Sequence, residues 1–423
     1  MYITCENSIM RGANSEMRIR AKTAFSNHLF LLIVLLLFMK PDSFNYIFPH
    51  IVTTFLSYGE RIVCFVVLGI CILDSINRYK NNIGDVIGLI LYKMIGTMAI
   101  SVVLWHSASG AGVFNHLRRL SIIWYVAIAM RYNFRLTIHV LTIVLCVYSS
   151  INLVTILLFP HGMYNDGNWQ CWFLGYDNGH MVVLMPALYF SWLDAHYRKR
   201  KLIMVLTWIS VYAGALICRS ATTLAGLAAL IVILVLIYVP VIRRFLFNWK
   251  TVLAVIIAVF TFIVVLRRQE VFQDILMRYF GKDTTFTGRI YLWDAALNAL
   301  KFHPWFGIGD SSVANVELFT LGVQKLAYAH NEILDLLVRS GVIGLLLYVG
   351  CIFRSVKLRV PKEMNRSDKV WLAFMASWWL SMMFESYSNY ALYWLYFVVM
   401  ICPRFEKRML TTLEKKQLLK ING

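Results

Sequence analysis

The chain has 423 residues, of which 59% are hydrophobic and 15% charged, and its mean hydropathy is +0.65. A soluble protein cannot bury so large an apolar fraction, so lipid must surround most of the chain. The formal net charge of +19 does not indicate nucleic-acid binding, because the basic residues fall mainly between the apolar runs, as they do in membrane proteins with several spans.

The apolar runs predict an all-α polytopic membrane protein with about twelve transmembrane helices, since roughly 20 residues cross a bilayer. The helices are expected near 27–41, 58–76, 85–105, 117–131, 136–159, 177–196, 202–218, 220–241, 250–267, 332–353, 370–385 and 390–403.

The distribution of Lys and Arg predicts the orientation, because cytoplasmic loops are rich in both. Most of the 41 basic residues lie in segments that are inside if both termini are cytoplasmic. The expected organisation is a cytoplasmic tail at 1–26, helices one to nine at 27–267, a large extracytoplasmic loop at 268–331, helices ten to twelve at 332–403, and a cytoplasmic tail at 404–423.

Two parts of the 268–331 loop, "EVFQDILMRYF" and "IYLWDAALNALKF", have apolar residues at helical spacing. We expect two short amphipathic helices at the outer membrane face, with Thr287 placed to cap the second. The apolar positions of the second helix are Ile290, Trp293, Leu297 and Leu300.

Two arginines are candidate anion-binding residues. Arg219 lies near the outer membrane boundary, where a guanidinium is costly and is usually kept for a partner or an anionic ligand. Arg289 would lie in the first turn of an outer helix, where its charge opposes the helix dipole unless an anion is bound between them. Snorkelling of Arg219 and simple exposure of Arg289 are the alternatives.

His330 opens the stretch "HNEILDLLVRSGVIG" at the water–membrane boundary. A histidine is able to accept a proton at neutral pH, and a structural role is the alternative. Asn331 and Glu332 could orient its ring, although Glu332 could equally be an ordinary acid in the first turn of a helix.

Further candidates are less specific. Arg118 and Arg119 lie on the outer side against the positive-inside pattern, so they either bind lipid headgroups or a diphosphate, or anchor the helix. The aromatic and amide residues of "FPHGMYNDGNWQCWFLGYDNGH" could stack on sugars, or belong to the interfacial aromatic belt. We expect no metal site and no cofactor, because the loops lack metal-ligand clusters and Walker motifs.

The order of these motifs resembles the bacterial O-antigen polymerase and ligase superfamily. The run from His330 to Gly344 is similar to its HNxxLxxLxxxGxxG signature, and Gly288-Arg289 with Trp293, Pro304 and "FGIG" is similar to its GRxxxW…PxxGxG segment. Arg219 resembles the arginine of its SR motif, although Cys218 precedes it here and a serine follows as Ser220.

The resemblance implies a glycosyltransferase of the bacterial inner membrane with an architecture like that of C-type glycosyltransferases and an outward-facing active site. Its substrate would be an oligosaccharide on undecaprenyl diphosphate. Arg219 and Arg289 would bind the diphosphate, and His330 would be the catalytic base of an inverting, metal-independent transfer.

The sequence favours a polymerase of surface polysaccharide repeats, and it leaves a ligase for lipid A-core or protein acceptors as the alternative. A transporter of lipid-linked sugars is a second alternative, although charged residues are sparse along the apolar runs. Expected partners are the lipid-linked oligosaccharide, membrane lipid and, for a polymerase, a chain-length regulator protein; nucleic acid is not expected.

Overall fold

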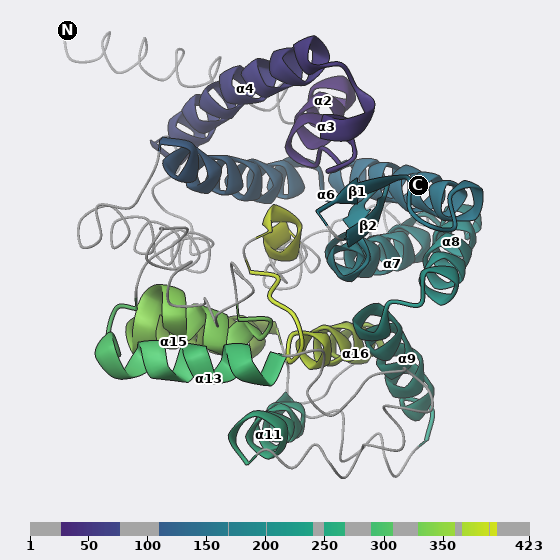
Figure 1. Ribbon diagram of the computed structural model, residues 1–423. Coiled ribbons are helices and arrows are strands. Elements are labelled where there is room, and N and C mark those ends of the chain that lie inside the picture. The colour runs from purple at the N-terminus through teal and green to yellow at the C-terminus, as the bar shows by residue number, and fades with distance from the viewer. Residues whose placement is uncertain are drawn as a thin grey trace, which may run out of the picture.

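A computed structural model describes residues 27–76, 110–167, 169–199, 201–239, 249–266, 289–307, 329–359, 366–388 and 390–395. Its described part is mostly helical, with one small sheet (Figure 1). The helices are α2 (His28–Phe38), α3 (Phe44–Ile47), α4 (His50–Ile76), α6 (Gly110–Leu158), α7 (Met181–Arg198), α8 (Leu202–Cys218), α9 (Ala221–Leu236), α11 (Trp249–Phe260), α13 (Arg289–Phe302), α15 (Glu332–Arg359) and α16 (Arg366–Ser381). A π-helical turn, η2 (Thr261–Val265), continues α11.

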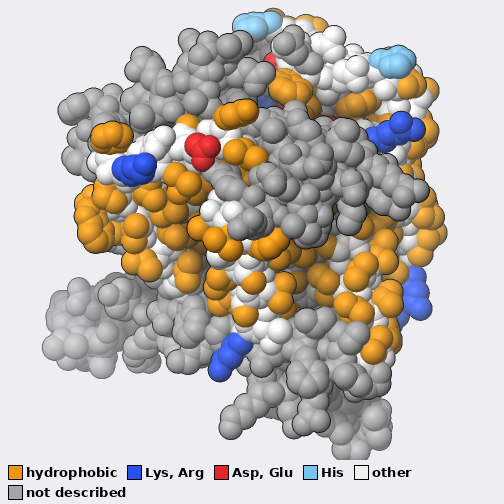
Figure 2. All heavy atoms as spheres, turned by 60° about the horizontal axis from the view of Figure 1, so that its bottom comes forward, with side chains coloured by type: hydrophobic (Ala, Val, Ile, Leu, Met, Phe, Trp, Pro, Cys, Tyr) orange, Lys and Arg blue, Asp and Glu red, His pale blue; other side chains and the backbone are white. Residues whose placement is uncertain are grey.

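Three helical segments of the described chain are long and apolar enough to cross a membrane, namely His50–Asp74, Phe114–Leu158 and Glu332–Gly350. Four shorter apolar helices accompany them. Figure 2 shows apolar side chains spread over the middle of one face, with Lys and Arg toward its edges. A face of this kind is stable against lipid, so the structure supports a membrane protein. The number of twelve spans remains a prediction, because several expected helices lie outside the described residues.

Helix α6 is the centre of the N-terminal half, because α2, α4, α7 and α8 all pack against it (Figure 1). Its path is broken at Asn133, whose φ of −147° and ψ of 79° are not helical. The Asn133 side chain accepts a hydrogen bond from the N–H of Leu136 at 3.2 Å and so caps the second half of the helix. The interruption falls between the two helices expected from the sequence at 117–131 and 136–159.

Helices α9 and α16 approach closely in the second half. A Cβ atom on Gly226 would overlap Ser381 and Met181, and the Ser377 hydroxyl donates to the Gly226 carbonyl at 2.6 Å. Small residues allow such backbone contact between helices in lipid. This contact places the end of α16, and the segment that follows it, beside the N-terminal half.

A three-stranded antiparallel sheet connects α6 to α7 and was not predicted from the sequence. Its strands are β1 (Tyr164–Asp166), β2 (Trp169–Trp172) and β3 (Gly175–Tyr176), and the 3₁₀ turn η1 (Asp177–His180) follows. The buried ring of His180 fixes β3, with Nε2 3.0 Å from the Gly175 carbonyl and Nδ1 3.5 Å from Nδ2 of Asn152. Asn152 also accepts the N–H of Leu174, so one histidine–asparagine pair holds the hairpin on α6.

Helix α13 lies along α15 (Figure 1), and two glycines allow the contact. The segment after α13 crosses α15 where α15 is interrupted at Gly341, whose φ is 63°. A Cβ atom on Gly341 would overlap the backbone of Trp305 and Phe306, and one on Gly307 would overlap the backbone of Val338 and Arg339. Val342 and Ile343 donate their N–H groups to the carbonyls of Pro304 and Trp305. This crossing fixes α13 against α15.

The face that α13 buries differs in part from the expected one. Of the expected apolar positions Trp293 is fully buried but Leu297 is exposed, and Ala295 and Ala296 are buried with Trp293 in a cluster that includes Leu334 and Val338 of α15. Small side chains let the two helices lie closer than leucines would. The expected helix in 270–280 and the cap Thr287 lie outside the described residues.

Substituting Gly341 by alanine should destabilise the protein by about 2 kcal/mol or more, because the side chain would occupy a left-handed backbone position and overlap the 304–307 segment. Thermal unfolding in detergent measures the effect. Gly350 on the same helix is the matched control, since its added Cβ meets no atom within 4 Å and alanine favours a helix. Equal melting temperatures for the two variants would contradict the proposed crossing.

Acid should weaken the hairpin through His180. Burial lowers the pKa of this side chain from 6.5 to about 4, so the unfolded state binds the extra proton between these values and the folded state does not. Stability is therefore fully present above pH 6.5 and falls as the pH drops toward 4, by on the order of 3 kcal/mol. The melting temperature of His180→Gln should fall less over this range than that of the wild type. Parallel curves for the two proteins would exclude His180 as the cause.

Candidate active site

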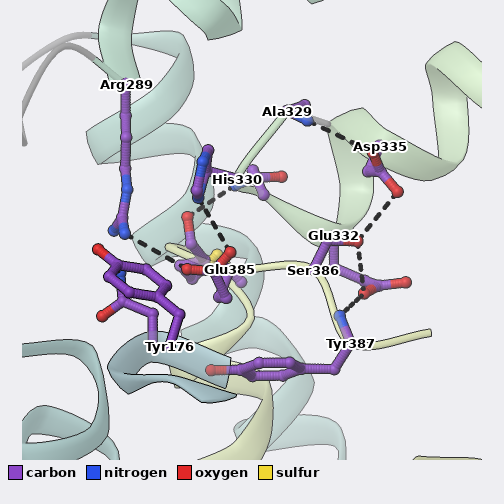
Figure 3. A network of polar contacts seen from close by, with 12 residues as sticks. Tyr176, Arg289, Ala329, His330, Glu332, Asp335, Glu385, Ser386 and Tyr387 are labelled. Atoms are coloured by element: carbon purple, nitrogen blue, oxygen red, sulfur yellow. Dashed lines mark hydrogen bonds and ion pairs between the residues drawn. The ribbon is translucent and has the colours of Figure 1, made fainter. Parts of the chain in front are cut away.

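Three side chains from separate parts of the chain meet around one carboxylate (Figure 3). Arg289 is the first residue of α13, His330 lies two residues before the start of α15, and Glu385 lies in the non-helical segment 382–388 after α16. Oε2 of Glu385 is 3.4 Å from Nη2 of Arg289, and Oε1 is 2.9 Å from Nδ1 of His330. The side chains of Arg289, His330 and Glu385 are 14%, 13% and 4% exposed, so the group is largely shielded from water. The structure thus brings together two predicted site residues and a third that was not predicted.

The backbone of His330 adopts a left-handed conformation, with φ of +47°. Such a conformation is uncommon for a residue other than glycine and must be held by its surroundings. Asn331 holds it: its Oδ1 accepts the N–H of Leu334 at 3.1 Å as the helix cap, and its Nδ2 donates to the Met383 carbonyl at 2.9 Å. Asn331 therefore positions His330 rather than contacting its ring.

Glu332 has the same kind of role. Its N–H donates to the Met382 carbonyl at 3.0 Å, and its Oε2 accepts the N–H groups of Tyr387 at 2.8 Å and Ser388 at 3.1 Å. These contacts satisfy buried backbone groups that no helix pairs. Glu332 consequently fastens both ends of the segment that carries Glu385.

Asp335, one turn further along α15, completes this attachment. Its Oδ2 accepts the Ser386 hydroxyl at 3.0 Å, and its Oδ1 accepts the N–H of Ala329 at 3.3 Å. Arg339 pairs with the same carboxylate at 2.8 Å. The residue before His330 and the residue after Glu385 are thus joined through one side chain.

Tyr176 of β3 lies beside this group in Figure 3. Burial, with the carboxylates of Asp177 and Glu385, raises the pKa of its phenol, and Arg289 acts in the opposite sense. The phenol stays protonated at neutral pH and can form hydrogen bonds in both senses. The end of the hairpin that carries Tyr176 therefore lies next to the charged residues.

Arg219 follows α8 in a left-handed conformation with φ of +57°, and its side chain is exposed. Ser220 caps α9 and donates to Oδ1 of Asn178 at 3.0 Å, while Nδ2 of Asn178 donates to the Tyr176 hydroxyl at 3.4 Å. The turn of Arg219 thus adjoins the η1 segment beside Tyr176. Within the described residues, no hydrogen bond or ion pair joins Arg219 to Arg289 or His330.

The remaining predicted residues, Arg118 and Arg119, belong to α6. Nη1 of Arg118 pairs with Oε1 of Glu60 on α4 at 2.9 Å, which gives this arginine a role in helix packing. Arg119 lies within electrostatic reach of Tyr390, as does Glu385. Arg119 and Glu385 therefore both act electrostatically on the same phenol.

Glu385 is the residue that sequence reasoning missed. It lies at the end of an expected transmembrane helix, at 370–385, where a single acid in "SMMFESYSNY" gives no spacing to interpret. A buried carboxylate within an apolar segment is nevertheless costly and is usually functional or paired. That signal alone could have identified it. Together, the three residues provide a positive group, a proton acceptor and a carboxylate that orients both.

Comparisons with known proteins agree with this location. Residues 205–349 match the protein family described as O-antigen ligase, and this segment includes Arg219, Arg289 and His330. Another similar protein is the exopolysaccharide production protein ExoQ of Rhizobium meliloti, at 34% identity over 83 residues. The matched stretch covers 18% of this chain and only 19% of that relative. The two matches confirm the resemblance found in the sequence: over residues 205–349 the chain is similar to proteins of the O-antigen ligase family.

Proposed function

We propose that this protein is a membrane glycosyltransferase that polymerises repeat units of a surface polysaccharide. The observation that carries the proposal is the contact of one buried carboxylate, Glu385, with both Arg289 and His330. The substrate would be a glycan on undecaprenyl diphosphate, and the acceptor would be a sugar hydroxyl of another lipid-linked repeat.

His330 is suited to act as the base in this reaction. A carboxylate oxygen 2.9 Å from Nδ1 favours the tautomer with its proton on Nδ1, in which the lone pair of Nε2 is the proton acceptor. The hydroxyl oxygen attacks the anomeric carbon while its proton moves to Nε2 of His330. The bond from the anomeric carbon to the diphosphate oxygen breaks from the opposite side, so the configuration inverts.

The leaving diphosphate needs positive charge, which Arg289 can supply. A guanidinium has five N–H donors, and the contact with Glu385 at 3.4 Å uses one of them. The other donors are available to two phosphate oxygens at once. Arg219 is the second candidate for this role, from the turn beside the η1 segment, and such fixed charge does the work that a metal ion does elsewhere.

Polymerisation is favoured over ligation by one comparison. The similar protein of Rhizobium meliloti is named an exopolysaccharide production protein, and an exopolysaccharide is a polymer of sugars, whereas a ligase would need a lipid A-core or protein acceptor. A ligase uses the same chemistry with a different acceptor, so the acceptor requirement separates the two functions.

Purified protein incubated with its lipid-linked repeat unit alone should form a ladder of longer products, resolved by size. His330→Ala should lower the rate at least about 100-fold, since general base catalysis contributes this much. His330→Asn is the companion variant, because asparagine tolerates the left-handed backbone but cannot take the proton. Folding is checked by the melting temperature of each variant.

The same experiment can reject the proposal. A folded His330→Asn protein with wild-type rate would exclude His330 as the base. A wild-type protein that forms product only after a separate lipid A-core or protein acceptor is added would be a ligase.

Glu385→Gln should reduce kcat about 100-fold with little change in KM, because the neutral amide no longer fixes the Nδ1 proton or balances the charge that forms on His330. Glutamine keeps the size of the side chain, so the segment 382–388 should remain attached through Glu332. Asp294→Asn, an exposed acid-to-amide change on α13, is the control and should retain wild-type kcat. An equal loss in both variants would indicate a general charge effect instead.

A further inference from the structure

One face of the β1–β3 sheet carries aromatic rings and a carboxylate side by side. Residues paired across antiparallel strands point to the same face, and so do residues two apart on one strand. The register pairs Tyr164 with Cys171, Asp166 with Trp169, and Cys171 with Tyr176. Tyr164, Asp166, Trp169 and Tyr176 therefore share one face.

Part of the opposite face of the sheet packs against the protein. Trp172 is buried there, and its Nε1 donates to the carbonyl of Phe159 at 2.8 Å. The edge of its ring also meets His180, with the two ring centroids 6.1 Å apart. Asn165 and Gln170, further along this face, are exposed. Trp172 thus attaches the sheet to the protein from one side, and the face of Trp169 is here called the outward side.

The rings on the outward side are arranged in pairs. Trp169 is 50% exposed and lies over Tyr176, with ring centroids 4.9 Å apart. Tyr46 of α3 is also 50% exposed and stacks on Tyr164 at 4.1 Å, with 22° between the planes. Tyr46, Tyr164, Asp166, Trp169 and Tyr176 are here named the aromatic face.

Polar groups surround these rings. The Asp166 side chain is exposed and lies within hydrogen-bonding reach of the Tyr46 phenol. Asp177 and Asn178 follow Tyr176 directly. Carboxylates and amides accept hydrogen bonds from hydroxyl groups, while an aromatic ring offers an apolar surface to a sugar ring.

We propose that the aromatic face binds a sugar unit of the acceptor glycan, an inference that rests on the proposed function. Tyr176 is the end of the aromatic face that adjoins Glu385, the carboxylate in contact with His330. A sugar stacked on Trp169 and Tyr176 would therefore have one end on the side of His330. The attacking hydroxyl must lie on that side to give its proton to the base.

The charge of the aromatic face distinguishes the acceptor sugar from the other ligands of the site. Its neighbouring carboxylates, Asp166 and Asp177, repel a diphosphate and the anionic surface of a membrane. Arg289, on the other side of Glu385, attracts the diphosphate instead. The site is thus divided into a cationic part for the donor head group and a neutral to acidic part for the sugars.

Binding of a lipid-free glycan tests this proposal without turnover. The probe is the repeat-unit oligosaccharide released from the lipid-linked substrate by mild acid, titrated into the full-length protein in nanodiscs by calorimetry. Trp169→Ala should weaken binding about tenfold through loss of the stacking surface. Trp305→Ala, in which another exposed tryptophan, beyond α13, is removed, should bind like the wild type.

Two further measurements make the result specific. Asp166→Asn should weaken oligosaccharide binding several-fold, and neither it nor Trp169→Ala should change the affinity for farnesyl diphosphate, the probe for the cationic part. In turnover, Trp169→Ala should raise the KM for the acceptor and leave kcat unchanged. A residue of the membrane interface would instead lower the yield and melting temperature of the protein.

The proposal is overturned if the wild-type protein binds no oligosaccharide, or if Trp169→Ala and Trp305→Ala bind it equally. Its failure is distinguishable from failure of the proposed function. A protein that forms the ladder of products without binding the free oligosaccharide retains the function and loses the aromatic face. A protein that binds the oligosaccharide through Trp169 but forms no product retains the aromatic face and loses the function.

Discussion

The arrangement of the site depends on one buried carboxylate. Glu385 is 4% exposed, and an ionised group at such a position is tolerated only with charged or hydrogen-bonding partners. Its partners are Arg289 at the start of α13 and His330 two residues before α15, so the energy that keeps the carboxylate buried also draws these segments together. Removing any one of the three residues leaves the others with uncompensated charge or an unsatisfied polar group.

The carboxylate can do this only because its own backbone is held. Segment 382–388 is not helical, although it follows a buried apolar helix, and its N–H groups need partners. Glu332, at the start of α15, accepts the N–H of Tyr387, and Asn331, its cap, donates to the carbonyl of Met383. The polar start of this helix, which seems unfavourable for a membrane segment, is therefore required by the segment opposite. Close backbone contact at Gly307 and Gly341 holds α13 against α15. Because Arg289 begins α13 and His330 lies just before α15, this contact also limits the distance between them.

Some of this could be predicted from the sequence, and some could not. Arg289 and His330 were identifiable because their motifs are local, with fixed spacing along the chain. Glu385 belongs to no such motif: it follows His330 by 55 positions, its role arises from a tertiary contact, and only the cost of a carboxylate in an apolar segment marks it in the sequence. The sheet escaped prediction because strands of two to four residues have too little alternation to recognise. The alanine-rich contact of α13 was missed because an apolar pattern favours large residues, whereas close helix packing favours small ones.

The shared carboxylate also connects donor binding to the position of the base in the proposed reaction. Glu385 contacts Arg289 through Oε2 and His330 through Oε1. A diphosphate on Arg289 would compete with Oε2 for the guanidinium, and the carboxylate would then interact mainly with His330. Donor binding and the orientation of the imidazole therefore act through the same side chain, so a change at Glu385 affects both.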